Sequence, residues 1–196
     1  MEIKEILEEG YSLGMMQDEY EIKNALEFVK SLGIKNFMEI GTDQGGTFLC
    51  WSRVSDPEGL RISVDWAHGP WGVNTFDIEA RNSKLLSLGS NVHILDGDSH
   101  AEWMYQKVKS IIGDQKLDFL FIDGDHSHIG VKLDYHMYKE FVKPGGWIGF
   151  HDIKETENHH SQGCYVDAFW RELDMEKIWF MSGTERCGIG FIKNNI

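Results

Sequence analysis

Short apolar runs alternate with helix-period patterns along most of the 196-residue chain, and this alternation constrains the fold more than any other feature. Over residues 22–29, apolar side chains recur at the i, i+3, i+4, i+7 spacing of a helix with one buried face, and Gly33 is expected to cap that helix. Five strand-like runs follow, at residues 36–40, 61–65, 91–95, 117–122 and 147–150. Strands that alternate with helices predict βαβ units and a mainly parallel sheet covered on both faces.

The C-terminal part departs from this alternation. Two strand-like runs, residues 177–181 and 188–192, follow one another through a turn at residues 183–185, which predicts an antiparallel pair. The helices are expected at residues 47–54, 77–88, 104–112, 131–142 and 166–173, the fourth burying Val131, Tyr135, Tyr138 and Val142. We therefore expect a doubly wound α/β domain with a seven-stranded, mainly parallel sheet and a C-terminal antiparallel hairpin.

Composition narrows the possible partners. The net charge is −13, with 32 acidic against 19 basic residues, and this excess disfavours a nucleic-acid partner. Cys50, Cys164 and Cys187 are far apart and show no C-x-x-C spacing, which favours free thiols in a reducing compartment. No apolar run approaches the ~20 residues needed to span a bilayer, and the acidic N-terminus does not resemble a secretory signal. We expect a cytoplasmic protein without a membrane partner.

Residues 119–153 carry the densest group of chemically active side chains. One strand breaks at Asp123, three residues before His126, and the next strand breaks at His151 and Asp152. Ligands of an open parallel sheet bind outside the carboxyl ends of the strands. We therefore expect these four side chains to surround one crevice and to form a metal or proton-transfer site.

A glycine-rich turn, residues 39–47, joins the first strand to its helix. A dinucleotide site would need a glycine at the position of Asp43, whose carboxylate would repel phosphate. A P-loop would need a lysine before Thr47, and Gly46 stands there instead. Both phosphate-binding interpretations therefore fail.

A cofactor with an ammonium group and ribose hydroxyls suits the turn better. Glu39 and Asp43 would attract the cation, and Asp65, at the end of the second strand, stands where an acid can bind both ribose hydroxyls. Asp98, after the third strand, would accept a hydrogen bond from an adenine amino group. The alternative is a structural glycine turn with structural acids.

These motifs resemble class I S-adenosylmethionine-dependent methyltransferases. The resemblance is carried by E-x-G-x-x-x-G-G, the acid after the second strand, G-D-S, F-I-D-G-D-H, and K-P-G-G followed by H-D. Within that class the chain resembles the branch of cephalosporin-hydroxylase-like proteins and metal-dependent macrolide-sugar O-methyltransferases. The resemblance covers residues 18–153 and, more weakly, the hairpin. It implies one methyltransferase domain, residues 1–196, with a helical segment 1–33, a cofactor-binding core 34–153 and a closing part 154–196.

The resemblance also implies the cofactor contacts. The strand-one glutamate and glycines would hold the methionine part, the strand-two acid would hold the ribose, and the G-D-S segment would border the adenine. Trp66 would cover the adenine face or simply pack against its neighbours. The residues expected at the cofactor are Glu39, Gly41, Thr42, Gly45, Thr47, Asp65, Trp66, Asp98, Ser99 and Asp123.

By position in the family, a divalent cation such as Mg²⁺ or Mn²⁺ would be held by Asp123, His151 and Asp152. Such a cation would lower the pKa of an acceptor hydroxyl and orient it. Most metal-dependent relatives place an oxygen ligand at the position of His151, and an imidazole suits Mn²⁺, Fe²⁺ or Zn²⁺ better than Mg²⁺. There are two alternatives. His151 contacts the ligands and not the cation, or the site holds no metal.

The catalytic residues are expected to be His126 and Asp123, because a histidine at the position of His126 is thought to be the general base in the sugar methyltransferases. Asp125 is the alternative base, or else the N-cap of the helix that begins near Ser127. Residues 155–163 are expected to form a flexible lid that contains His159 and His160, with direct metal ligation as the alternative.

The predicted function is O-methylation of a small hydroxylated acceptor, assisted by a divalent cation, in a protein that can form a homo-oligomer. One alternative is the same fold with other metal-dependent chemistry, such as hydrolysis or hydroxylation. The other is a cofactor-binding module without turnover.

Overall fold

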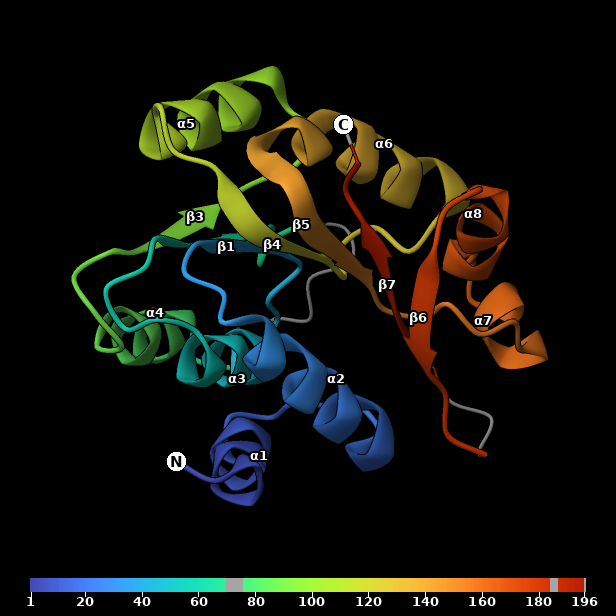
Figure 1. The fold of residues 1–196 in the computed structure, drawn as a ribbon, viewed down its shortest axis with the longest axis horizontal. Helices are drawn as coiled ribbons and strands as arrows, with labels where there is room; N and C mark the ends of the chain where they lie inside the picture. The colour runs from blue at the N-terminus through green and yellow to red at the C-terminus, as the bar shows by residue number, and fades with distance from the viewer. Residues whose placement is uncertain (70–75, 184–186, 196) are drawn as a thin grey trace.

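The computed structural model of the chain describes residues 1–69, 76–183 and 187–195. A seven-stranded sheet runs through its centre, with helices on both sides (Figure 1). The strands are β1 (Phe37–Ile40), β2 (Arg61–Asp65), β3 (Val92–Asp96), β4 (Leu117–Ile122), β5 (Val142–Phe150), β6 (Lys177–Phe180) and β7 (Ile189–Lys193). The α-helices are α1 (Ile3–Ser12), α2 (Glu19–Leu32), α3 (Gly46–Val54), α4 (Ile78–Leu86), α5 (Glu102–Ile112), α6 (His128–Tyr138), α7 (Glu157–Ser161) and α8 (Val166–Glu172).

The strand order is β3-β2-β1-β4-β5-β7-β6. The first five strands are parallel, whereas β7 pairs antiparallel with both β5 and β6. The predicted seven-stranded sheet with its antiparallel C-terminal hairpin is therefore confirmed. The order reverses between β1 and β4, which is the point where open α/β sheets bind their ligands.

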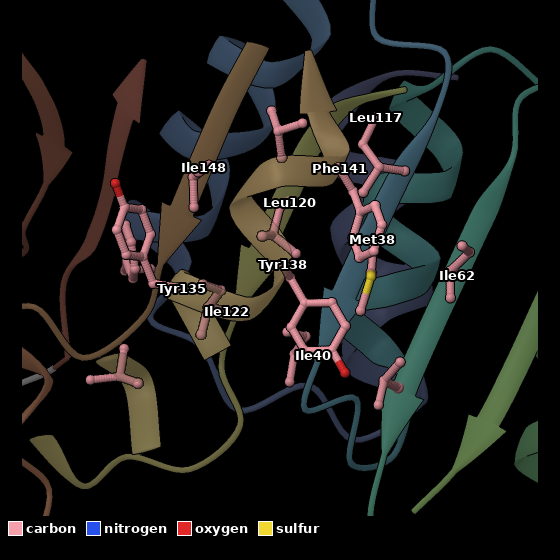
Figure 2. Close-up of a cluster of buried hydrophobic side chains, with 14 of the residues drawn as sticks. Met38, Ile40, Ile62, Leu117, Leu120, Ile122, Tyr135, Tyr138, Phe141 and Ile148 are labelled. Atoms are coloured by element: carbon pink, nitrogen blue, oxygen red, sulfur yellow. The ribbon is translucent and has the colours of Figure 1, made fainter. Parts of the chain in front are cut away.

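Each face of the sheet has its own apolar core. Helices α1 to α4 cover one face, and α5 and α6 cover the other (Figure 1). On the second face, Met38, Leu120 and Ile148 of three adjacent strands pack against Tyr135 and Tyr138 of α6 (Figure 2). All five side chains are buried, and burying a large apolar side chain contributes roughly 1.5–3 kcal/mol. The two cores hold the sheet rigid behind the loops at its carboxyl edge.

The predicted cap of the second helix is confirmed. Gly33 adopts φ +60° as the C-cap of α2, and Asp18 caps the other end by accepting hydrogen bonds from the backbone N–H groups of Tyr20 and Glu21. The sequence also predicts a loop at residues 68–75, of which residues 70–75 lie outside the described residues, as do residues 184 and 185 of the predicted turn at 183–185.

The prediction that the fourth helix extends to Val142 is wrong. Helix α6 ends at Tyr138, a 3-10 turn (Lys139–Phe141) follows, and Val142 begins β5 opposite Leu117. Val142 pairs with β4 instead, and Pro144 disfavours helical geometry in the residue before it, Lys143. Strand β5 is correspondingly longer than predicted, and residues 143–146 form a bulge before the pairing resumes at Phe119 and Trp147.

The segment 155–163 is not wholly a loop as predicted, because it contains the short helix α7. The Thr156 hydroxyl caps this helix by accepting a hydrogen bond from the backbone N–H of His159. A five-residue helix is too short to show a periodic apolar pattern, so the sequence did not indicate it. Within the described ranges, no helix has the length and apolar character needed to cross a membrane.

Candidate active site

The loops after β1 and β4 meet at the reversal of strand order. Gly41 adopts φ +82°, and a Cβ atom at this position would overlap the carbonyl oxygen of Asp123. Gly45, at φ +92°, is the N-cap of α3. The predicted glycine turn thus lets two backbone segments approach closely, and it brings Asp123 beside the first turn of α3.

Glu39 points into the protein beneath this turn. Its side chain is fully buried, and its Oε2 atom accepts a hydrogen bond of 2.9 Å from the Thr42 hydroxyl. The Thr42 hydroxyl also lies 2.7 Å from that of Ser63 in β2. Burial raises the pKa of the Glu39 carboxyl well above its usual value. In this structure Glu39 and Thr42 hold the turn in place, and their direct contact with a cofactor stays a prediction.

Asp65 is tied to the same turn. Its Oδ1 atom accepts hydrogen bonds from the backbone N–H groups of Thr42 and Asp43, at 3.1 and 3.3 Å. Its Oδ2 atom pairs with the guanidinium of Arg81, which also donates to the carbonyl oxygen of Asp43. Arg81 is a buried cation that the sequence analysis missed, since nothing distinguishes it from other arginines of an amphipathic helix. Asp65 therefore keeps only part of its accepting capacity for a ribose.

The predicted adenine side of the crevice is more open. Asp98 is 39% exposed, and its carboxylate accepts a hydrogen bond of 2.9 Å from the backbone N–H of His100. The carbonyl oxygen of Ser99 accepts a hydrogen bond from the Tyr138 hydroxyl. Trp66 is 46% exposed, as a side chain available to a ligand would be. These positions agree with the predicted adenine contacts but do not test them.

A second titratable pair, also missed from the sequence, lies beneath that loop. His100 Nε2 is 3.2 Å from Oδ1 of Asp134, which is fully buried in α6. The Asp134 carboxylate raises the pKa of His100 to about 9, against a smaller opposing effect of burial. The pair fastens the β3–α5 loop to α6.

The predicted catalytic cluster does come together. His126 lies between two carboxylates, with Nδ1 2.9 Å from Asp152 Oδ2 and Nε2 3.3 Å from Asp123 Oδ1. His151 Nδ1 lies 3.1 Å from Asp123 Oδ1 and 3.3 Å from Asp152 Oδ1. The His126 side chain is 40% exposed, whereas the other three are largely buried. His126 is therefore the member that an acceptor can reach.

The charges of this cluster stabilise one another. Burial alone raises the pKa of the Asp123 and Asp152 carboxyls, but His151 and His126 outweigh it and hold both below their usual range. Burial lowers the pKa of the two imidazoles, and the carboxylates outweigh that effect and raise it. The cluster thus favours two carboxylates facing two imidazolium groups at neutral pH.

Asp125 accepts a hydrogen bond from Ser127 N–H, and Ser127 is the N-cap of α6, so the prediction of Asp125 as that N-cap is wrong.

His159, which was expected in the lid segment, and Cys187, which was not predicted, also approach the cluster. Asp152 adopts φ +59°, an uncommon conformation for a residue with a side chain, and its two oxygens face different neighbours. On the Oδ1 side, His159 Nε2 lies 3.7 Å away, and Cys187 Sγ lies 3.8 Å from that nitrogen. His160 instead pairs with Asp167 at 3.0 Å, so the two adjacent histidines contact different carboxylates.

The N-terminal segment reaches the cluster from the other side. Gln17 donates a hydrogen bond of 3.2 Å to Asp123 Oδ2 and accepts one of 2.9 Å from the Thr47 hydroxyl. Thr47 is thus linked to Asp123 through Gln17. No sequence motif marks Gln17, because its role depends on how the segment between α1 and α2 folds over the sheet.

The fold and the site together define a class: a doubly wound α/β protein with a glycine turn at the strand reversal and an acid–imidazole cluster beside it. Comparison with known proteins identifies the family. A family model described as a methyltransferase domain matches residues 38–153, more than half of the chain. The chain therefore belongs to this family of methyltransferase domains.

Solved structures share the fold over nearly the whole chain. An O-methyltransferase from Bacillus cereus, in complex with S-adenosylhomocysteine, has a TM-score of 0.67 at 16% identity and covers 98% of this chain and 90% of that one. TomG from Streptomyces achromogenes, an O-methyltransferase of tomaymycin synthesis in complex with S-adenosylmethionine, has a TM-score of 0.65 at 14% identity and covers 98% and 89%. At these identities the likeness shows a common fold.

A relative by sequence is an uncharacterized protein of Acanthamoeba polyphaga mimivirus. It is 28% identical over 121 residues, which are 61% of this chain and 52% of that protein. The match therefore spans about half the length of this relative. The family model, and not this relative, confirms the predicted methyltransferase family.

Proposed function

We propose that this protein transfers a methyl group from S-adenosylmethionine to a hydroxyl group of a small acceptor, with His126 as the general base. The observation that carries the proposal is the position of His126. Its imidazole is held by Asp123 and Asp152 at the strand reversal, yet 40% of it is exposed. The acidic surface and the three unpaired cysteines favour a small-molecule acceptor and a reducing, cytoplasmic location.

The crevice has the features that this cofactor needs. When bound, S-adenosylmethionine supplies an electrophilic methyl group on a sulfonium centre. The close approach at Gly41 leaves the edge of the sheet lined by backbone, and the acids at the ends of β2 and β3 can accept bonds from hydroxyl and amino groups. Asp98 has the greater accepting capacity, because Asp65 is already bonded to two backbone N–H groups and to Arg81. We propose that Asp65 and Asp98 share the recognition of the adenosine part.

The two carboxylates around His126 support its role as a base. A base must accept a proton from the acceptor hydroxyl as the oxygen attacks, and the resulting imidazolium is stabilised by a neighbouring carboxylate. Asp152, 2.9 Å from Nδ1, is placed to do this, and Nε2, which has the longer contact of 3.3 Å to Asp123, would take the proton when the acceptor hydroxyl replaces that contact. Because the two carboxylates raise the pKa of His126, the neutral imidazole becomes more abundant as the pH rises. We therefore expect methyl transfer to increase with pH above neutrality.

The predicted cation at Asp123, His151 and Asp152 stays a prediction, and the donor arrangement does not fit a hard cation. The imidazole of His151 lies between the two carboxylates, where Mg²⁺ would need to contact oxygen atoms. In the described part of the chain, Asp123 also belongs to none of the groups whose possible ligand atoms lie within 4.8 Å of one another. The proposed chemistry needs only His126 and its carboxylates.

The test combines cofactor binding with turnover. We expect S-adenosylhomocysteine to bind the wild-type chain in isothermal titration calorimetry, and no binding would overturn the proposal in favour of other chemistry. Methyl transfer from labelled S-adenosylmethionine is then measured on a panel of sugars and catechols. His126→Asn should keep the affinity for S-adenosylhomocysteine and lower the rate by about 10²- to 10⁴-fold, as for a lost general base. His136→Asn, on the exposed face of α6, is the matched control and should do neither.

A further inference from the structure

A group of nitrogen and sulfur donors lies on the side of Asp152 that faces away from His126. The possible ligand atoms of His151, Asp152 and Cys187 all lie within 4.8 Å of one another. His159 Nε2 lies beside this group, 3.7 Å from Asp152 Oδ1 and 3.8 Å from Cys187 Sγ, but it is not among the donors that all lie within 4.8 Å of one another. Three separate segments supply these residues: the end of β5, helix α7 and the residue that leads into β7.

Several polar atoms of this group are buried without a well-directed hydrogen bond. They are both ring nitrogens of His151, Oδ1 of Asp152 and Nδ1 of His159. The side chains of His151 and Asp152 are 10% and 6% exposed, so water is largely excluded. Leaving a buried polar atom unsatisfied costs about 1–3 kcal/mol, and native proteins rarely leave several together. Such a group is typical of a site that binds an ion.

The spacing suits a tetrahedral ion of the zinc class. Metal–sulfur bonds of ~2.3 Å and metal–nitrogen bonds of ~2.0–2.1 Å place neighbouring tetrahedral ligands about 3.3–3.6 Å apart. The distances of 3.3 Å from His151 Nδ1 to Asp152 Oδ1, and of 3.7 and 3.8 Å from His159 Nε2 to its two neighbours, are close to that range. A donor set of one thiolate, two imidazoles and one carboxylate favours Zn²⁺ over Mg²⁺.

We propose that His151, Asp152 and Cys187 bind one zinc-class cation, with His159 moving in as the fourth ligand when the ion binds. Cys187 would bind as the thiolate and release its proton to solvent. Four protein ligands fill a tetrahedral shell, so the ion joins helix α7 and the hairpin to the end of β5 and does not contact the acceptor. Because the Oδ2 atom of Asp152 bonds to His126 at 2.9 Å, the ion also fixes the carboxylate that orients the base. The site stands independently of methyl transfer.

Cobalt spectroscopy tests the site. The full chain is stripped of metal with a chelator and titrated with Co²⁺, whose thiolate complexes absorb in the near ultraviolet. We expect one Co²⁺ per chain with a thiolate band, and Zn²⁺ should displace it. Cys187→Ser should abolish the band and weaken Zn²⁺ binding by about 10-fold or more, since even losing an outer-shell partner costs that much. His159→Asn should weaken Zn²⁺ binding comparably but retain the thiolate band.

Two other cysteines serve as controls. Cys50→Ser should retain the band, because Cys50 lies in α3 and contacts Ile6 and Met15. Cys164 forms a rival group with His126 and Asp152, so loss of the band in Cys164→Ser but not in Cys187→Ser would overturn the proposal. Binding of less than one Co²⁺ per chain would overturn it as well. Calorimetry with S-adenosylhomocysteine on the metal-free chain shows separately whether the cofactor site is intact.

Discussion

At the scale of single residues, the closest fit in the site is that of Gly41. Its φ of +82° is strained for any other residue, and a Cβ atom would overlap the carbonyl oxygen of Asp123. Gly41→Ala should therefore lower the free energy of unfolding by about 3 kcal/mol or more, adding steric overlap to an unfavourable φ. Urea denaturation followed by circular dichroism measures the change.

Gly33→Ala provides the matched control. Gly33 also has a positive φ, +60°, but no atom lies within 4 Å of the position that a Cβ would take. Its substitution should cost only about 1 kcal/mol, from the backbone conformation alone. If the two substitutions lower the free energy of unfolding equally, the contact between the β1 and β4 loops adds no penalty to a side chain at position 41.

Residues adjacent to strand ends were predictable from the sequence, and residues that reach the site from elsewhere were not. Asp123 and Asp152 were found because a parallel sheet brings its carboxyl ends to one edge. Arg81, Gln17 and Cys187 lie in segments whose position depends on how helices and the hairpin pack against the sheet. Their sequence neighbourhoods carry no motif, so only the tertiary structure reveals them.

At the scale of elements, helix α2 and the C-terminal hairpin are joined by one buried side chain. Glu21 is fully buried, and its carboxylate accepts hydrogen bonds of 2.8 and 2.9 Å from the backbone N–H groups of Ser182 and Gly188. Glu21→Ala should lower the free energy of unfolding by about 3 kcal/mol, since two hydrogen bonds to a charged group are lost. Urea denaturation gives the total, and hydrogen exchange should show faster exchange of the Gly188 amide. Glu19→Ala, on the exposed side of the same helix, should change neither quantity by much.

Element types were predicted better than element ends. The βαβ alternation gives the sheet and its helices, because each element must bury an apolar face. The error at Val142 has a physical origin: its spacing from Tyr138 fits a helix, but Pro144 two positions later and the glycines after it favour an extended bulge. The helical spacing and the proline–glycine segment predict different structures for Val142. Pairing with β4 decides between them, and the local sequence pattern does not show that pairing.

At the scale of the whole molecule, the charge balance of buried pairs makes stability depend on pH. His100 joins the β3–α5 loop to α6 through Asp134, with Asp98 and Asp125 also facing it. The pKa of His100 is raised to about 9 in the folded state, mainly by the Asp134 carboxylate. Its unfolded value is ~6.5. A raised folded pKa means that the stabilisation is complete below about pH 6.5 and is lost as the pH rises through about 9.

Between pH 6 and pH 9.5 the free energy of unfolding should fall by on the order of 1–2 kcal/mol. This is less than the pKa shift alone would give, because the imidazole is partly exposed to solvent. Urea denaturation at several pH values measures it, and His100→Gln should remove this part of the pH dependence. Other groups titrate in the same range, so the quantity compared is the difference between wild type and variant. If the two curves stay parallel from pH 6 to pH 9.5, the His100–Asp134 pair is not charged in the folded protein. His136→Asn, an exposed histidine in the same helix as Asp134, should leave the part of the curve above about pH 7.5 unchanged, because burial and two nearby lysines lower the pKa of His136 and keep it neutral there.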